Sequence, residues 1–104
     1  EELGLMARDA SLLPGNAAIQ YRYGLALYLN GDKDQAEEAL SAACRIEPNN
    51  EQFLFALVLF YDKYERFREA LEGIDRLLKM RPTDRQYLGL QAELERKLKG
   101  GTQK

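Results

Sequence analysis

Histidine is absent from the 104-residue chain, and cysteine occurs once, as Cys44. Without histidine no imidazole can serve as the general base for a nucleophile, and one cysteine forms neither an internal disulfide nor a thiolate metal cluster from this chain alone. Cys44 falls on the apolar face of a predicted helix, which is typical of a small buried hydrophobe. The scattered glycines make no phosphate-binding loop. We therefore predict no catalytic residue, no metal site and no cofactor, and do not expect an enzyme.

The sequence also lacks a long hydrophobic run and an excess of charge of one sign. The longest apolar stretch, residues 53–61, has nine residues, whereas a membrane helix needs roughly 18. Lysine and arginine total 15 against 17 aspartates and glutamates, a formal net charge of −2, whereas phosphate binding depends on a basic excess. We expect neither membrane insertion nor a nucleic-acid partner. The single cysteine favours a reducing compartment, so the cytoplasm is the expected location.

Proline occurs only three times, and its spacing indicates a repeat. Pro14, Pro48 and Pro82 are separated by 34 residues in each case. An alignment of the chain on this period also pairs seven positions of compatible size. These pairs are Tyr23/Leu57, Gly24/Val58, Leu27/Tyr61, Ala36/Ala70, Leu40/Ile74, Ala43/Leu77 and Ile46/Met80. Three prolines could coincide by chance, but with seven matched positions the pattern predicts internal repeats.

Local chemistry predicts two helices within each period. Residues 17–30 carry apolar side chains on nearly every side, and Asn30-Gly31 offers a left-handed helix end. Residues 33–47 have an apolar face, with Asp32 or Asp34 as the cap at their start. The proline that follows stops this helix.

The same pattern continues to the end of the chain. It predicts helices over residues 51–64, 67–81 and 85–99, and a further helix over residues 2–13. Asn49-Asn50 and Thr83-Asp84 are the expected caps. The fold class is thus all-α with about six helices in a single array over residues 1–104. Its expected parts are the second helix of a truncated repeat (1–16), two repeats (17–50 and 51–84), a C-terminal capping helix (85–99) and a tail (100–104).

This repeat resembles the tetratricopeptide repeat family, whose 34-residue unit pairs two antiparallel helices. The family pattern W-x2-L-G-x2-Y, then A-x3-F, A and P, falls on Gln20, Tyr23, Gly24, Leu27, Ala36, Leu40, Ala43 and Pro48. One period later it falls on Leu54, Leu57, Val58, Tyr61, Ala70, Ile74, Leu77 and Pro82. Gln20 replaces the usual tryptophan and Val58 the usual small residue, which indicates looser local packing. The resemblance implies an α-α superhelix of the helix-turn-helix solenoid type.

The resemblance also implies where a partner binds, because the first helix of each unit lines a concave surface in such arrays. On the first helix three residues at i, i+4 and i+7 form one stripe, and three more repeat that stripe one period later. Two apolar stripes could receive an extended peptide or a helix. The predicted binding residues are Tyr21, Leu25, Tyr28, Phe55, Leu59, Asp62 and Gln86.

Two alternatives stay open. Residues 53–61 are apolar all round, so Leu54, Leu57, Val58 and Tyr61 are interpreted as core, whereas Phe55 and Leu59 either bind a partner or are buried by the twist of the fold. The leading hypothesis is a non-catalytic module that binds a protein or peptide. The alternative is a self-associating or scaffolding segment of a larger multi-domain protein, a homodimer built on an apolar edge. That edge consists of Leu3, Met6, Ala10 and Leu13.

Overall fold

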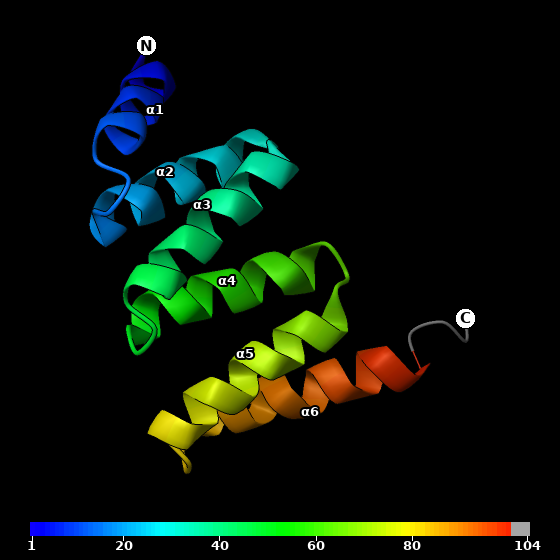
Figure 1. Ribbon diagram of the computed structural model, residues 1–104. Coiled ribbons are helices and arrows are strands. Elements are labelled where there is room, and N and C mark those ends of the chain that lie inside the picture. Colours follow the sequence, from blue (N-terminus) through cyan, green and yellow to red (C-terminus); the bar gives the residue numbers. More distant parts are fainter. Residues whose placement is uncertain (101–104) are drawn as a thin grey trace. The chain divides into compact units, whose positions relative to one another are not determined.

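A computed structural model describes residues 1–100, which form six α-helices joined by short turns (Figure 1). They are α1 (Glu2–Leu12), α2 (Ala17–Asn30), α3 (Lys33–Ile46), α4 (Glu51–Lys63), α5 (Phe67–Met80) and α6 (Arg85–Gly100). The prediction of an all-α helical repeat with about six helices is confirmed for these residues. Apart from Gly100, which ends α6, the predicted tail lies outside the described residues.

The chain divides into two compact units, which we call the N-terminal unit (Glu1–Ala56) and the C-terminal unit (from Leu57 onward). The boundary lies inside α4, so the two units do not coincide with the two sequence repeats. In the N-terminal unit α2 packs against both α1 and α3, and in the C-terminal unit α5 packs against α6. The single array over residues 1–104 stays a prediction.

Proline sets the ends of three helices. We predicted that these helices end at Leu13, Glu47 and Arg81, but each ends one residue earlier. All three residues have φ between −126° and −136° and ψ between 62° and 81°, although their N–H groups still donate to the carbonyl four residues back. Each precedes a proline, whose ring excludes the helical conformation from the residue before it. Each of these helices therefore ends one residue before the residue whose N–H donates its last hydrogen bond.

Three helices begin with a side-chain cap, and these caps recur every 34 residues. The Oδ1 atoms of Asn16, Asn50 and Asp84 accept hydrogen bonds of 3.0–3.1 Å from the backbone N–H three residues later. The caps predicted at Asn50 and Asp84 are confirmed. Asp32, by contrast, caps α3 without a side-chain bond, because its Oδ2 accepts from the amide of Asn30 at 3.0 Å.

The contact between α2 and α3 is close because a glycine lies at the crossing. A Cβ atom built on Gly24 would lie 2.8 Å from Cγ and Cδ2 of Leu40 and 3.1 Å from its backbone nitrogen. Leu40 and its neighbours Ala36 and Ala43 are almost completely buried. Ile46, which we placed on the same apolar face, is 39% exposed instead, since it is the last residue of α3 and extends beyond the packed turns.

Gln20 is buried in the N-terminal unit, at 8% exposure. Its amide donates to the carbonyl of Ala10 at 3.2 Å and to that of Pro14 at 3.5 Å, which ties α2 to the end of α1. A buried amide is tolerated when it is hydrogen-bonded. Val58 is completely buried as well, and the looser packing expected at Gln20 and Val58 stays a prediction.

In the C-terminal unit the buried residues of α4 differ from the expected set. Phe60 is completely buried, with its ring 5.0 Å from that of Tyr64 and 5.6 Å from that of Tyr61. Leu57 and Tyr61, which we expected in the core, are only half-buried. On α5 the apolar stripe is completely buried; it consists of Ala70, Ile74 and Leu77.

Candidate functional site

The three predicted binding residues of α2 are all half-buried. The ring of Tyr21 stacks on that of Phe53 at the start of α4, with 4.7 Å between centroids and an interplanar angle of 30°. Tyr21 therefore packs within the N-terminal unit and presents only part of its surface. Leu25 and Tyr28 follow it at i+4 and i+7 and keep part of their side chains exposed.

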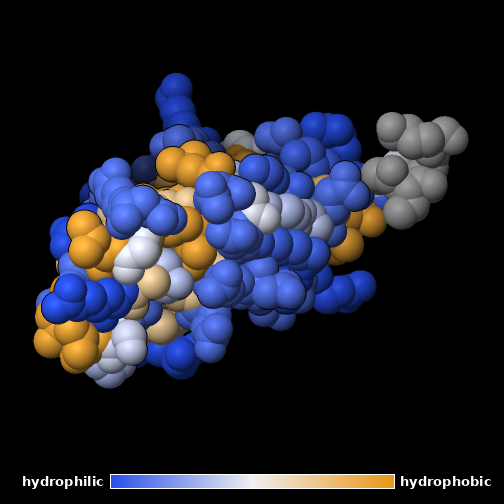
Figure 2. Space-filling view, turned by 90° about the horizontal axis from the view of Figure 1, so that it is seen from above, coloured by the Kyte–Doolittle hydropathy of each residue, from blue (hydrophilic) through white to orange (hydrophobic). Residues whose placement is uncertain are grey.

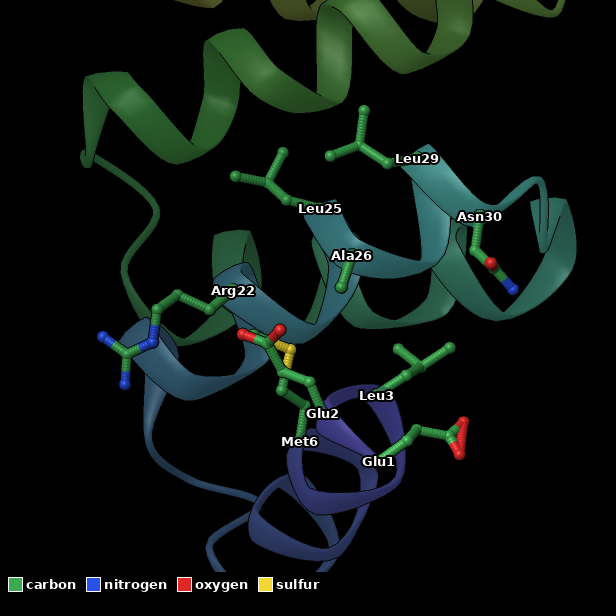
Figure 3. A pocket seen from close by; sticks show the side chains of 9 residues that line it. All are labelled: Glu1, Glu2, Leu3, Met6, Arg22, Leu25, Ala26, Leu29 and Asn30. Carbon is green, nitrogen blue, oxygen red and sulfur yellow. The ribbon is translucent and has the colours of Figure 1, made fainter.

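Leu25 also lines an open cleft of about 670 Å³ between α1 and α2, which we call the N-terminal cleft. Figure 3 shows Glu2, Leu3 and Met6 rising from α1 toward α2, while Ala26 points back toward them. The complete lining is Glu1, Glu2, Leu3, Met6, Arg22, Leu25, Ala26, Leu29 and Asn30. Its floor is mainly apolar and its charged groups are two carboxylates and one guanidinium.

The remaining four predicted residues are divided between the two units. Phe55 lies in the N-terminal unit and is half-buried, whereas Leu59 lies in the C-terminal unit and is exposed. Asp62 is in the C-terminal unit on α4, and Gln86 is an exposed residue of α6. The N-terminal unit therefore contains four of the seven predicted residues, and the C-terminal unit contains the other three. The four are Tyr21, Leu25, Tyr28 and Phe55.

Asp62 accepts a hydrogen bond from a lysine of α6. The Nζ atom of Lys97 donates to Oδ1 of Asp62 at 3.0 Å, approaches Glu93 at 3.6 Å, and lies 5.6 Å from the ring centroid of Phe67. The hydrogen bond to Asp62 raises the pKa of Lys97 above its ordinary value. Asp62 therefore already contributes to the packing of α6, and a partner would compete with Lys97 for it.

Apolar side chains reach the surface in several separate places between hydrophilic ones, as the orange areas of Figure 2 show. The most exposed is Leu29 on α2, at 82%. Leu29 is not among the seven predicted binding residues, although it lies one turn after Leu25 on the same helix. The other exposed large hydrophobic residues are Leu5, Leu12, Leu13, Ile46, Leu59, Met80, Leu88 and Leu98.

Within residues 1–100, no helix has the length and apolar content to cross a membrane. Over the same residues, no three acidic or cysteine side chains are grouped so that they could hold a metal ion.

Comparison with known families finds one similarity. Residues 17–60 match the family model of the tetratricopeptide repeat. This part of the chain is similar to the tetratricopeptide repeat family. The match starts at the first residue of α2 and extends into α4, so it covers the Gly24–Leu40 crossing. Tetratricopeptide repeats typically mediate contacts between proteins and are typically not enzymes. No curated protein matches the sequence significantly.

Proposed function

We propose that this chain is a non-catalytic module that binds an extended peptide or a helix of a partner protein. In the N-terminal unit the binding surface consists of Tyr21, Leu25, Tyr28 and Phe55. In the C-terminal unit the predicted contributors are Leu59, Asp62 and Gln86. The similarity of residues 17–60 to the tetratricopeptide repeat family supports a protein partner.

The observation that carries the proposal is the incomplete burial of apolar side chains on α2 and α4. Phe53 and Phe60 are buried, but Phe55 between them is only half-buried, and Leu25 and Tyr28 are half-buried on α2. Aromatic and large aliphatic side chains that keep exposed surface are typical anchors of protein interfaces. An extended peptide or a helix with apolar side chains fits such a surface.

Selection from a displayed peptide library on the immobilised chain tests the proposal, followed by titration of a selected peptide. Phe55→Ala should weaken its binding by more than about 1 kcal/mol and leave the unfolding midpoint close to that of the unmodified chain. Phe60→Ala is the matched control on the same helix, because Phe60 is completely buried. That change should reduce stability by about 3–5 kcal/mol.

If Phe55→Ala unfolds the protein while affinity for the peptide is retained, Phe55 belongs to the core and the proposed surface is wrong. Light scattering over a hundredfold range of concentration tests the alternative of self-association. A constant monomer mass agrees with an external partner. A dimer that dissociates when Leu13 is replaced by asparagine would favour a self-associating segment instead.

A further inference from the structure

The turn between α2 and α3 contains the only asparagine of the chain that a glycine follows. The sequence has four asparagines, and the residues after the other three are Ala17, Asn50 and Glu51. The backbone nitrogen of the next residue can attack the side-chain amide carbon of an asparagine, and a side chain on that next residue hinders the attack. Glycine has no Cβ atom, so Asn30-Gly31 is the pair most prone to this reaction.

Both residues of this pair are open to water. Asn30 and Gly31 are exposed, and a Cβ atom built on Gly31 would meet nothing within 4 Å. The turn also borders an open hollow of about 560 Å³, which is lined by Gly31, Asp32, Lys33, Asp34 and Gln35. Water therefore reaches the pair in the folded protein.

Hydrogen bonds hold both reacting groups in the turn. The Nδ2 atom of Asn30 donates to Oδ2 of Asp32 at 3.0 Å. The backbone N–H of Gly31 donates to the carbonyl of Tyr28 at 3.2 Å, so the attacking nitrogen is occupied while the last turn of α2 is closed. Helix ends open more readily than helix centres, and the reaction takes place when this turn opens.

The remaining asparagines and the second repeat provide internal references. Asn16 and Asn50 cap α2 and α4, because their Oδ1 atoms accept backbone N–H groups at 3.0 and 3.1 Å. In the second repeat Tyr64 and Glu65 stand 34 positions after the Asn30-Gly31 pair. Glu65 has a φ of 60°, so this turn has a left-handed residue without the reactive pair.

We propose that Asn30 is a site of spontaneous deamidation, with water as the co-reactant. The nitrogen of Gly31 forms a bond to Cγ of Asn30 and loses its proton, while the Cγ–Nδ2 bond breaks and ammonia leaves. The product is a five-membered succinimide, and water adds to one of its two carbonyl carbons. Cleavage of the new Cγ–N bond gives aspartate, and cleavage of the original peptide bond gives isoaspartate.

Either product disturbs the α2–α3 turn. Aspartate at position 30 replaces the hydrogen-bond donor by a second carboxylate beside that of Asp32, at the end of α2 where the helix dipole disfavours negative charge. Isoaspartate adds one atom to the main chain before Gly31. The N–H groups of Gly31 and Asp32 now donate to the carbonyls of Tyr28 and Leu27, and the added atom displaces both from these positions. Deamidation should therefore destabilise the pair of helices.

Mass spectrometry after trypsin digestion measures the reaction at separate sites. Cleavage after lysine and arginine leaves Asn30 in the peptide of residues 23–33, which has no other asparagine and no glutamine. The other asparagines fall in the peptides of residues 9–22 and 46–63. The whole chain is incubated for days at mildly alkaline pH. The peptide of residues 23–33 should gain about one mass unit at least about fivefold faster than the other two, because glycine alone leaves the attacking nitrogen unhindered.

Matched variants test the chemistry and the role of the hydrogen bond. Asn30→Gln keeps an amide but would have to form a six-membered ring, so its peptide should keep its mass. Asp32→Ala frees the Nδ2 atom and should raise the rate at Asn30 at least about twofold; Asp32 makes no side-chain cap that this change would remove. Asp34→Ala removes the same charge from the first turn of α3 and should leave the rate unchanged.

Thermal unfolding before and after incubation measures the effect on the fold. The melting temperature of the incubated chain should fall by at least about 2 °C once most of Asn30 has reacted, whereas that of Asn30→Gln should stay constant. Asn30→Asp reproduces the aspartate product alone and should lie between the fresh and the incubated chain, because it lacks the added main-chain atom.

Three outcomes would overturn the proposal. Equal rates in the three peptides, or an unchanged mass of residues 23–33, would show that Asn30 is not a deamidation site. A constant melting temperature in a chain that has reacted would refute the effect on the turn. An unchanged rate in Asp32→Ala would show that the Asn30–Asp32 hydrogen bond does not restrain the amide.

Discussion

The two complete repeats, residues 17–50 and 51–84, share one period but use different residues at equivalent positions. Gly24, at the close crossing with α3, corresponds to Val58, which is completely buried. Gly31, with φ 86°, corresponds to Glu65, with φ 60°. The 34-residue period thus preserves the backbone conformation, while the side chain at each position depends on the space its own neighbours leave. The predictions below exchange residues between the repeats, beginning with the largest effect.

Exchange at the helix crossing should have the largest effect. Gly24→Val places a β-branched side chain 2.8 Å from Leu40, so the helices must separate, and Val58→Gly removes a buried side chain and adds backbone entropy to the unfolded state. Each change should reduce the free energy of unfolding by about 2–4 kcal/mol, measured by urea denaturation. The control is Gly89→Val on α6, where an added Cβ meets nothing within 4 Å. An unchanged midpoint for Gly24→Val would refute the close crossing.

Exchange between Gln20 and Leu54, which are equivalent in the two repeats, should change stability by different amounts in the two directions. Leu54 is almost completely buried, so Leu54→Gln leaves an amide without partners and should cost about 2–3 kcal/mol. Gln20→Leu removes the donor to the Ala10 and Pro14 carbonyls but adds apolar burial, so its cost should stay near 1 kcal/mol. Hydrogen exchange should become faster in α1 for Gln20→Leu only. Equal costs for the two changes would contradict the role assigned to the Gln20 amide.

Exchange at the turn between the paired helices should act in opposite directions. Gly31→Glu forces a side chain into the left-handed conformation and should destabilise the fold by about 1–2 kcal/mol. Glu65 already occupies that conformation, so Glu65→Gly relieves the strain and should stabilise the fold by about 0.5–1 kcal/mol. Thermal unfolding of both variants measures the effect, and a lower melting temperature for Glu65→Gly would refute this explanation.

The smallest effect concerns an ion pair at the start of α5. Nη2 of Arg66 lies 3.1 Å from Oε2 of Glu69, and this hydrogen bond lowers the pKa of Glu69 below its ordinary value. The equivalent position of the first repeat is Gln35. Because the folded pKa is lower than the unfolded one, the stabilisation is complete above the unfolded pKa of about 4.3. It disappears as the pH falls through the folded pKa.

Glu69→Gln should therefore reduce stability by less than about 1 kcal/mol at neutral pH, since the pair is only partly buried and water screens it. Once Glu69 is protonated, the two proteins should be equally stable. Urea unfolding at several pH values measures the difference between the two proteins. A difference that persists at the acidic end would mean that Glu69 stabilises α5 through its packing and not through its charge.

The sequence by itself determined the helices and their ends. The proline period placed all six within one residue of their observed bounds, and Asn50, Asp84 and Gly31 act as expected. These features depend on the chemistry of a few adjacent residues. Because a proline disfavours the helical conformation of the residue before it, Leu13 lies just outside α1.

Only the tertiary structure decided which apolar residues form the core and which remain at the surface. Phe60 and Phe55 are the same residue type on one helix, but only Phe60 is completely buried. Residues from different helices come together in three places. Tyr21 stacks on Phe53, Lys97 donates a hydrogen bond to Asp62, and Met6 lines the cleft between α1 and α2. A helical pattern specifies the face of a residue, but burial depends on which other helix approaches that face and how closely.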